Sequence, residues 1–533
     1  MTAIDALPWK TYLELVRAAA GAHGDRAYLV DGEVTLSFNA LSERVDEMSR
    51  AHLAAGIGFG DRIAIWAPNI WEWVVVALGA QSIGAVLIPL NTRFKGAEAV
   101  DILERGNVSA LFTVTDFLDT NYLELIERTG APLASLRRRV VLRGDAAGPS
   151  DSYADYVATG RSISDEQLAA AHGRVSGDSV SDILFTSGTT GAPKGVVTTH
   201  AQNLAAFQAW ASVIGLDASD THLVINPFFH AFGYKAGWLA SLIAGATCLP
   251  HLVFDAGAVL TRIQDEGITS IPGPPTLFQS MLVHPHLSSF DLSSLRLAVT
   301  GAASIPVELI IAMRERLGFE TVITGYGLTE ACGIATMCRD GDAPEIIAAT
   351  SGRAIPDVEV CCIDASGVSV PAGEAGEVVI RGYNVMREYL DDPVATTEVI
   401  DSDGWLHTGD IGVMDEHGNL RITDRVKDMF IVGGFNAYPA EIENLLLLHP
   451  DIAFAAVIGV PDERMGEVGA AYVVPKPNLM IDVDTLRTWA RDQMANYKVP
   501  RYFEVLESLP MNATGKVTKF ELRERFARHT ATG

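Results

Sequence analysis

Short apolar segments alternate with helix-length segments along the N-terminal part of the chain, and this alternation constrains the fold more than any other feature. Residues 62–66 and 85–89 are predicted strands, and the segment between them, from Trp71, is a predicted helix. Further strands are predicted at residues 223–226 and 297–299. Strands that alternate with helices build a layered α/β fold.

The pattern changes in the C-terminal part, where short β segments are separated by Gly, Pro and Asp. Residues 358–363, 376–381 and 419–423 predict a small barrel-like β subdomain. After a short charged segment the chain begins again with a helix, two strands and another helix, enough for a small α+β domain. We therefore expect a large N-terminal domain of layered α/β subdomains over residues 1–426 and a small C-terminal domain over residues 427–533.

Composition excludes several classes of partner. The 533 residues include 66 acidic and 40 basic side chains, a net charge of −26, so we expect no nucleic-acid partner. A membrane span needs about 20 unbroken apolar residues, and polar residues interrupt the longest apolar run, at 73–90. Five cysteines without zinc-ligand spacing, and a start without a basic leader region, predict a cytoplasmic location. The sequence leaves open whether the chain forms a homo-oligomer.

One loop rich in Gly, Ser and Thr directly follows a predicted apolar strand. Its glycines let backbone N–H groups converge without Cβ atoms in the way, its hydroxyls add donors, and its lysine adds positive charge. This chemistry suits a polyphosphate. The loop does not have Walker spacing, which argues against an ATP-binding transporter or motor subunit. The residues assigned to phosphate are Thr186, Ser187, Gly188, Thr189, Thr190, Gly191 and Lys194.

Residues 186–195 resemble the signature of the adenylate-forming superfamily, which includes acyl-CoA synthetases, peptide-synthetase adenylation domains and beetle-type luciferases. Further blocks match in the family's order over almost the whole chain. The resemblance implies ATP, Mg²⁺ and coenzyme A as cofactors and a small-molecule carboxylic acid as substrate. It also implies that the C-terminal domain is mobile.

A second block places an aromatic residue between two glycines, Gly325-Tyr326-Gly327, where it can lie flat on a purine. In the matching family block Tyr326 stacks on adenine, Thr329 binds phosphate and Glu330 holds Mg²⁺. Phosphate with one or two carboxylates is the usual ligand set of Mg²⁺.

Other nucleotide contacts are assigned by the resemblance. One carboxylate can accept two hydrogen bonds from a vicinal diol, so Asp410 is expected at the ribose. Arg425 matches a family arginine that contacts the nucleotide. Small residues that end the predicted strand at 297–299 are assigned to the adenine cleft: Gly301, Ala302 and Ala303.

Three of the nine lysines lie on family positions: Lys194, Lys427 and Lys516. The resemblance makes Lys427 the hinge between the two domains, and makes Lys516 the catalytic lysine that bridges the attacking carboxylate and the α-phosphate. A fixed cation there stabilises charge as the phosphorus is attacked. Gly433 and Gly434 are assigned to the loop that reaches the thioester site.

The pocket for the acid substrate is predicted from residues 226–233. These residues resemble the acyl-CoA synthetase block with an aromatic and a histidine at the carboxylate pocket. His230 stands about where amino-acid adenylation domains have Asp, which argues against an α-amino acid. The alternative for His230 is a histidine of the core. Lys235 either faces this pocket or is a charge at the surface or behind it.

Residues 329–339 resemble the ligases that activate a bicyclic, steroid-ring-derived propanoate in actinobacteria. The predicted enzyme is thus an AMP-forming acid–thiol ligase, and that propanoate is one candidate acid. A medium-chain fatty acid or an aryl acid is an alternative. A luciferase-like oxygenase or a stand-alone adenylation domain would share the same blocks. A non-catalytic relative is disfavoured because the positions that carry the chemistry are intact.

Overall fold

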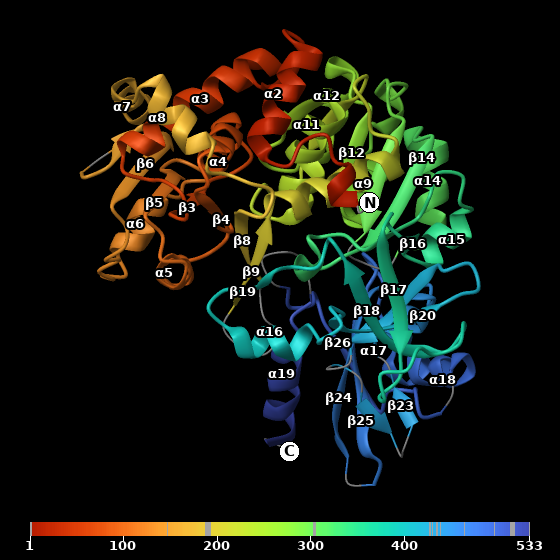
Figure 1. The fold of residues 1–533 in the computed structure, drawn as a ribbon. Coiled ribbons are helices and arrows are strands. Elements are labelled where there is room, and N and C mark those ends of the chain that lie inside the picture. Colours follow the sequence, from red (N-terminus) through yellow and green to blue (C-terminus); the bar gives the residue numbers. More distant parts are fainter. Residues whose placement is uncertain are drawn as a thin grey trace. The chain divides into compact units, whose positions relative to one another are not determined.

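The computed structural model contains two compact units (Figure 1). It describes residues 3–146, 148–186, 193–301, 305–425, 428, 430–432, 435–437, 439–462, 464–494, 496–511 and 517–531. Unit 1 comprises Met1–Val360 with Ile380–Leu406, and unit 2 comprises Cys361–Val379 with His407–Gly533. The predicted α/β class, with a large N-terminal and a smaller C-terminal part, is confirmed.

The first sheet of unit 1 has nine strands in the order β16-β15-β14-β13-β12-β10-β11-β1-β2. Its central strands pair in parallel, from β11 through β10, β12 and β13 to β14. The strands are β1 (Ala27–Asp31), β2 (Val34–Ser37), β10 (Thr221–Val224), β11 (Thr247–Pro250), β12 (Ser270–Pro272), β13 (Leu297–Gly301), β14 (Thr321–Tyr326), β15 (Thr336–Met337) and β16 (Arg353–Ala354).

The second sheet of unit 1 has eight strands in the order β19-β9-β8-β4-β3-β5-β6-β7. Strands β8 and β9 form an antiparallel pair, whereas β3 pairs in parallel with β4 and β5. The strands are β3 (Arg62–Trp66), β4 (Val86–Pro89), β5 (Ala110–Val114), β6 (Arg138–Arg143), β7 (Asp151–Ser152), β8 (Val180–Thr186), β9 (Lys194–Thr199) and β19 (Glu388–Tyr389).

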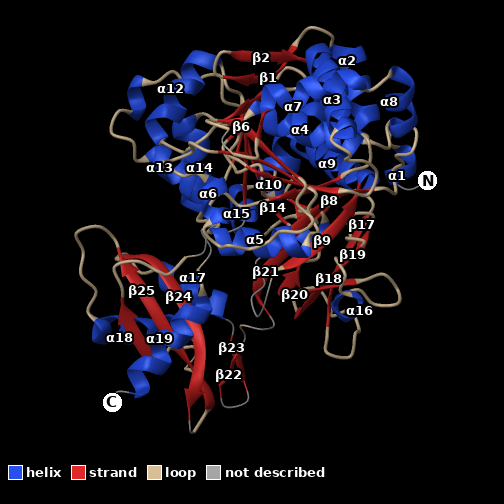
Figure 2. Cartoon of the chain, turned by 90° about the vertical axis from the view of Figure 1, so that its left-hand side faces the viewer, coloured by secondary structure: helices blue, strands red, loops and turns tan. Residues whose placement is uncertain are grey.

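Helices flank both sheets, and Figures 1 and 2 both show α3 and α4 well apart from α12 and α14, with strands between them. The helices are α1 (Ala3–Ala6), α2 (Tyr12–His23), α3 (Phe38–Ala54), α4 (Trp71–Ser82), α5 (Gly96–Arg105), α6 (Tyr122–Glu127), α7 (Tyr153–Thr159), η1 (Gly160–Ser162), α8 (Asp165–His172), α9 (His200–Ile214), α10 (Ala231–Gly233), η2 (Tyr234–Leu239), α11 (Ala240–Ala244), α12 (Ala256–Glu266), α13 (Pro275–Leu282), η3 (Leu287–Ser289), α14 (Val307–Leu317), η4 (Thr329–Ala331), α15 (Pro344–Ala349) and α16 (Pro393–Val399).

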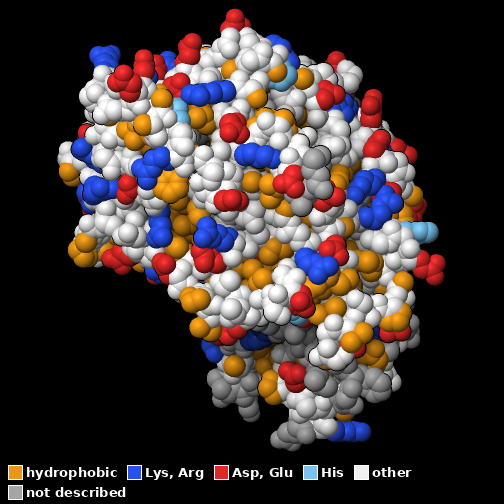
Figure 3. All heavy atoms as spheres, in the orientation of Figure 1, with side chains coloured by type: hydrophobic (Ala, Val, Ile, Leu, Met, Phe, Trp, Pro, Cys, Tyr) orange, Lys and Arg blue, Asp and Glu red, His pale blue; other side chains and the backbone are white. Residues whose placement is uncertain are grey.

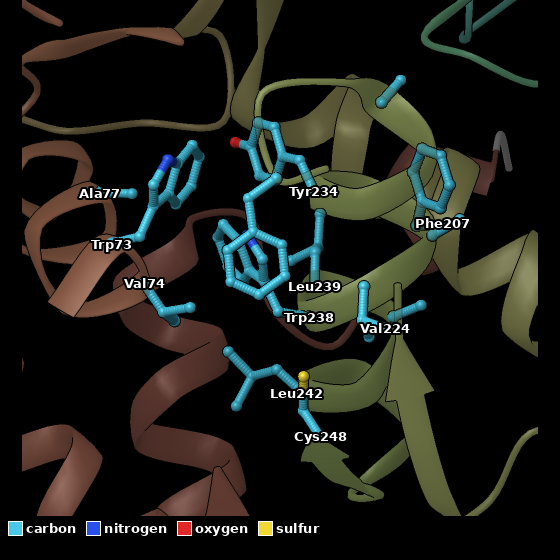
Figure 4. Close-up of a cluster of buried hydrophobic side chains, with 14 of the residues drawn as sticks. Trp73, Val74, Ala77, Phe207, Val224, Tyr234, Trp238, Leu239, Leu242 and Cys248 are labelled. Carbon is cyan, nitrogen blue, oxygen red and sulfur yellow. The ribbon is translucent and has the colours of Figure 1, made fainter. Parts of the chain in front are cut away.

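The core of unit 1 is rich in aromatic side chains. Trp73 of α4 and Tyr234 and Trp238 of η2 face one another in Figure 4, and the Tyr234 and Trp238 rings stack at 4.8 Å. The apolar run that could suggest a membrane segment is α4 followed by β4, and both are buried here. Among the described helices, none has both the length and the apolar character needed to cross a bilayer.

Element η2 is a π-helix set between the short helices α10 and α11. π-Helical segments are rare in proteins, and those that occur often lie at functional sites. The predicted strand at 223–226 ends two residues early, at Val224. The reason is that the Asn226 carbonyl oxygen accepts from the Asn69 side chain, and Pro227 has no N–H for a ladder.

Unit 2 carries two smaller sheets, in the orders β17-β18-β20-β21 and β23-β22-β25-β24, with β26 paired to β25. The predicted small β subdomain corresponds to the first of them. The elements are β17 (Val358–Ile363), β18 (Ala375–Gly382), β20 (Leu406–Met414), β21 (Leu420–Arg425), β22 (Phe430–Val432), β23 (Phe435–Ala437), α17 (Pro439–Leu447), β24 (Ile452–Asp462), β25 (Gly466–Pro475), α18 (Val483–Gln493), β26 (Tyr502–Val505) and α19 (Lys519–Ala531).

Acidic and basic side chains are interspersed on the face of the molecule drawn in Figure 3. On this face the acidic side chains therefore do not form one continuous acidic patch.

Candidate active site

The carboxyl ends of two neighbouring parallel strands bring the predicted adenine-cleft residues together. Gly301 of β13 pairs with Gly325 of β14. A Cβ atom on Gly301 would lie 3.0 Å from the carbonyl oxygen of Gly325, and one on Gly327 would collide with the carbonyl oxygen of Gly333. Glycine is therefore required for this close backbone approach. Tyr326, which is half-buried, follows directly at the end of β14.

Beyond β14, the predicted metal-binding acid sits on a short 3₁₀ turn that starts at Thr329. The Glu330 carboxylate accepts a hydrogen bond from the Tyr389 hydroxyl at 2.8 Å, and the Glu330 carbonyl oxygen accepts one from the Met386 N–H at 2.7 Å. Burial, and then the Glu330 charge, raise the pKa of Tyr389 above its ordinary value, so the phenol stays protonated and donates. Both bonds fix the direction of the carboxylate.

The predicted phosphate lysine lies against the same tyrosine. The Lys194 ammonium lies 4.8 Å from the centre of the Tyr389 ring, a cation–π contact. Tyr389 is only 7% exposed and belongs to β19, which pairs with β9. Two residues that are 136 positions apart, Lys194 and Glu330, thus converge on one side chain (330 − 194 = 136). Sequence reasoning missed Tyr389, because no local pattern marks it.

The two ends of the predicted phosphate loop are held by adjacent strands. Thr186 of β8 pairs with Lys194 of β9, and the Thr186 hydroxyl donates to the Lys194 carbonyl oxygen at 3.3 Å. This pairing sets Lys194 beside Thr186, the first residue of the predicted loop. The other predicted phosphate residues lie outside the described residues: Ser187, Gly188, Thr189, Thr190 and Gly191.

The predicted ribose acid and its arginine lie on paired strands of unit 2. Asp410 of β20 is opposite Arg425 of β21 and is 4% exposed. The Asp410 N–H donates to the Thr408 hydroxyl at 3.0 Å, and that hydroxyl donates to the Val378 carbonyl oxygen at 2.7 Å. For Arg425 the structure describes only the backbone. The predicted residues that lie outside the described residues are Ala302, Ala303, Lys427, Gly433, Gly434 and Lys516.

On the acid side, His230 is exposed, which contradicts a place in the core. It caps α10, and its Nδ1 accepts the Phe232 N–H at 3.1 Å. A neutral ring that accepts at Nδ1 carries its proton on Nε2, so Nε2 can donate. The preceding loop is held by Asn69, which is 2% exposed and accepts the Phe228 N–H at 2.7 Å. Asn69 is a second residue that sequence reasoning missed.

Lys235 does not lie at the surface. It is 1% exposed, and its ammonium is 3.2 Å from the carboxylate of Asp182, which is fully buried. A charged residue inside an otherwise apolar segment is the signal that could have pointed to this pair. Asp182 stands in such a segment of β8, and Lys235 in one of η2.

Comparison with known families identifies the family to which this chain belongs. Residues 16–390 match the AMP-binding enzyme family, and residues 441–516 match the AMP-binding enzyme C-terminal domain. The chain belongs to the AMP-binding enzyme family. The predicted membership of the adenylate-forming superfamily, with the acyl-CoA synthetases, is confirmed.

This AMP-binding enzyme has curated relatives of nearly its own length. It is 46% identical over 512 residues to the 3-[(3aS,4S,7aS)-7a-methyl-1,5-dioxo-octahydro-1H-inden-4-yl]propanoyl:CoA ligase of Rhodococcus jostii (strain RHA1), covering 96% of this chain and 97% of the relative. It is 46% identical over 500 residues to the ligase of the same name from Mycobacterium tuberculosis, covering 94% and 96%. These relatives confirm the resemblance to ligases of a bicyclic propanoate.

A solved relative shows the same fold over the full length. The crystal structure of the anthranilate CoA ligase AuaEII in complex with anthranoyl-AMP has a TM-score of 0.89 and 27% identity, and the match covers 100% of both chains.

Proposed function

We propose that this chain is an AMP-forming acyl-CoA ligase that converts a carboxylic acid, ATP and CoA into an acyl-CoA, AMP and pyrophosphate. The observation that carries the proposal is the convergence of Lys194 and Glu330 on Tyr389. A cation and a carboxylate that contact the same tyrosine suit a metal-bound polyphosphate, because the cation would attract phosphate oxygens and the carboxylate would bind the metal.

The reaction has two steps, and different residues serve each. First, a carboxylate oxygen of the acid attacks the α-phosphorus of ATP, the bond from that phosphorus to the bridging oxygen breaks, and pyrophosphate leaves. Lys194 stabilises charge on the leaving group, and Lys516 is proposed to stabilise the attacking oxygen and the α-phosphate. Asp410 is proposed to hold the ribose.

In the second step the CoA sulfur attacks the acyl carbon, the bond from that carbon to the AMP oxygen breaks, and the thiol proton is lost. We propose that rotation about Lys427 removes Lys516 and brings Gly433 and Gly434 to the site, so that one small domain serves both steps. We also propose that this domain comprises residues 427–533.

The residues present fit Mg²⁺ as the metal. The described residues include no group of three or more acidic, histidine or cysteine side chains that could hold an ion by themselves. Glu330 would supply one carboxylate. Mg²⁺ commonly keeps its waters and takes one or two carboxylates plus substrate phosphates. When bound, it would neutralise charge on the phosphates.

The acid is the finer part of the proposal. The two curated relatives are named for a propanoyl group on a bicyclic octahydroindene dione. We propose an acid of this class, with the Nε2–H of His230 beside the carboxylate. An aryl acid is the second candidate, because the solved relative is an anthranilate ligase. We further propose a cytoplasmic enzyme.

The test is pyrophosphate and AMP release from Mg·ATP with a panel of acids, with and without CoA. The panel holds a bicyclic propanoate, aryl acids, medium-chain fatty acids and amino acids. CoA-dependent release with one class, together with its thioester, supports the proposal and names the acid. Pyrophosphate release without any CoA-dependent product would contradict the ligase and favour another acyl acceptor or an oxygenase.

A further inference from the structure

A buried carboxylate lies four residues before the start of the phosphate loop. Asp182 of β8 is fully buried and accepts hydrogen bonds from neutral donors on four elements, β8, β9, α9 and η2. The bonds come from the hydroxyls of Ser181 (2.8 Å), Thr198 (2.8 Å) and Tyr234 (3.3 Å) and from the Asn203 amide (2.6 Å). Thr198 belongs to β9, so the carboxylate joins the two strands that flank the loop.

The only ion-pair partner of Asp182 among the described residues comes from the acid side of the site. Lys235 stands in the π-helix η2, five residues after His230, and its ammonium also lies 3.4 Å from the Thr198 hydroxyl. The helix packs closely on the sheet, because a Cβ atom on Gly237 would lie 2.6 Å from Val224. The pair thus joins the phosphate side to the acid side.

Such a pair is not explained by stability alone. Removing two charges from water costs more than their attraction returns in many proteins, and apolar replacements are often neutral or stabilising. A buried pair does restrict geometry, because each charge tolerates few positions of the other. We propose that the Asp182–Lys235 ion pair is a positioning element, which fixes both strands of the phosphate loop against the helix that follows His230. The inference rests on the proposed function and assigns it two further residues.

The test compares this pair with a second ion pair of unit 1. Asp220 is 2% exposed and accepts from Nε of Arg296 at 2.7 Å, at the amino ends of β10 and β13 in the nine-stranded sheet. The variants are Lys235→Met, the double variant Asp182→Asn with Lys235→Met, and the control Arg296→Met. Each is measured for its unfolding midpoint, for the Kd of Mg·ATP by calorimetry, and for acid-dependent pyrophosphate release.

We expect Lys235→Met to lower the unfolding midpoint, to weaken Mg·ATP binding and to slow pyrophosphate release roughly 10- to 100-fold, since small misplacements of reacting groups cost that much. The double variant should regain the midpoint but not the rate. Arg296→Met should lower the midpoint yet keep the rate and the Kd within about twofold of wild type.

Two results would overturn the proposal. One is a Lys235→Met protein whose Kd for Mg·ATP and rate of pyrophosphate release equal those of wild type at a temperature well below its unfolding midpoint. The other is a double variant that regains its rate together with its stability, because the pair would then only fill space. Failure of the proposed function looks different: the wild type binds Mg·ATP but no acid releases pyrophosphate, and the Kd values still decide the role of the pair.

Discussion

The two edges of the nine-stranded sheet in unit 1 differ in how completely their polar groups are bonded. At the amino edge, the residues just before β10, β12 and β13 are Asp220, Thr269 and Arg296. The Thr269 hydroxyl donates to Asp220 at 2.6 Å and accepts the Thr221 N–H at 3.0 Å, while Arg296 donates to the same carboxylate. The polar side chains at this edge therefore hydrogen-bond to one another.

At the carboxyl edge, one described hydroxyl is left without a partner. Thr300 of β13 is 1% exposed, and its hydroxyl has no hydrogen-bond partner within the described ranges. The residues beyond it on β13 and β14 are small, Gly301 and Gly325. Buried polar groups normally find partners, so an exception calls for an explanation. Folding satisfies the groups at one edge, and the other edge keeps bonding capacity for a ligand, as open α/β sheets generally do at their carboxyl ends.

The largest expected effect distinguishes the carboxylate of Glu330, which follows the carboxyl edge, from that of Asp220 at the amino edge. Glu330→Gln should lower kcat/KM for pyrophosphate release about 10²- to 10³-fold, because the neutral amide stabilises a metal ion poorly. Asp220→Asn at the amino edge should lower the unfolding midpoint and leave kcat/KM nearly unchanged. A Glu330→Gln enzyme with normal kcat/KM at saturating Mg²⁺ would remove the metal assignment.

The next effect concerns the residue on which Lys194 and Glu330 converge. Tyr389→Phe keeps the ring under Lys194 but deletes the hydroxyl that orients Glu330. A hydrogen bond to a charged group is worth about 1.5 to 3 kcal/mol, so kcat should fall about 10-fold or more. Titration with Mg²⁺ should show a raised half-saturation concentration. An unchanged Mg²⁺ dependence would mean that Tyr389 is only packing.

A matched pair of threonines tests the comparison most directly. Thr300→Val removes a hydroxyl without a described partner, so the free protein should be as stable as wild type or more stable by about 1 kcal/mol. Mg·ATP binding should weaken a few-fold, on the same basis. Thr269→Val should do the reverse, with lower stability and unchanged binding. Chemical denaturation and calorimetry measure both, and equal behaviour of the two variants would erase the distinction between the edges.

The last effect lies between the edges, at His222 of β10. Its ring contacts the Ser270 hydroxyl at 2.8 Å and the Ala236 carbonyl oxygen at 3.2 Å, and burial lowers its pKa from 6.5 to about 4. Between these pH values the unfolded chain binds a proton that the folded chain excludes, so stability falls as pH falls.

By pH 5 each such histidine should cost about 1 to 2 kcal/mol of unfolding free energy. His52 behaves in the same way, since burial lowers its pKa to about 4. Urea unfolding at a series of pH values measures the trend, and a His222→Asn variant should have a shallower slope than wild type. A flat unfolding free energy from neutral pH to about pH 5 would contradict the buried neutral state.

Much of the fold follows from local pattern. The strands β3 and β17 occupy the residues predicted, and α3 begins at the Ser37 cap and buries Leu41 and Val45, which lie four residues apart on one face. These elements need only a period of 2.0 or 3.6 and a start or stop signal, all of which are written in neighbouring residues.

The sequence could not predict contacts between residues that are far apart in the chain. Tyr389 reaches Glu330 because β19 pairs with β9, and Lys235 reaches Asp182 because a π-turn changes the spacing of its helix. Neither pairing has a periodic signal, since both depend on tertiary contacts formed after the elements are in place. The family motifs named the chemistry of the site, and only the structure shows how Lys194 and Glu330 are joined.

The π-helix at Tyr234–Leu239 also depends on the exact number of residues in this segment. An α-helix turns about 100° per residue, so deleting one residue here would restore α-helical spacing and swing Lys235 by that angle relative to everything that follows. The ammonium would then leave Asp182. A homologue with one residue fewer in this segment is therefore expected to lack an acid at the position of Asp182 too, so a single gap in an alignment would mark which members of the family build this buried pair.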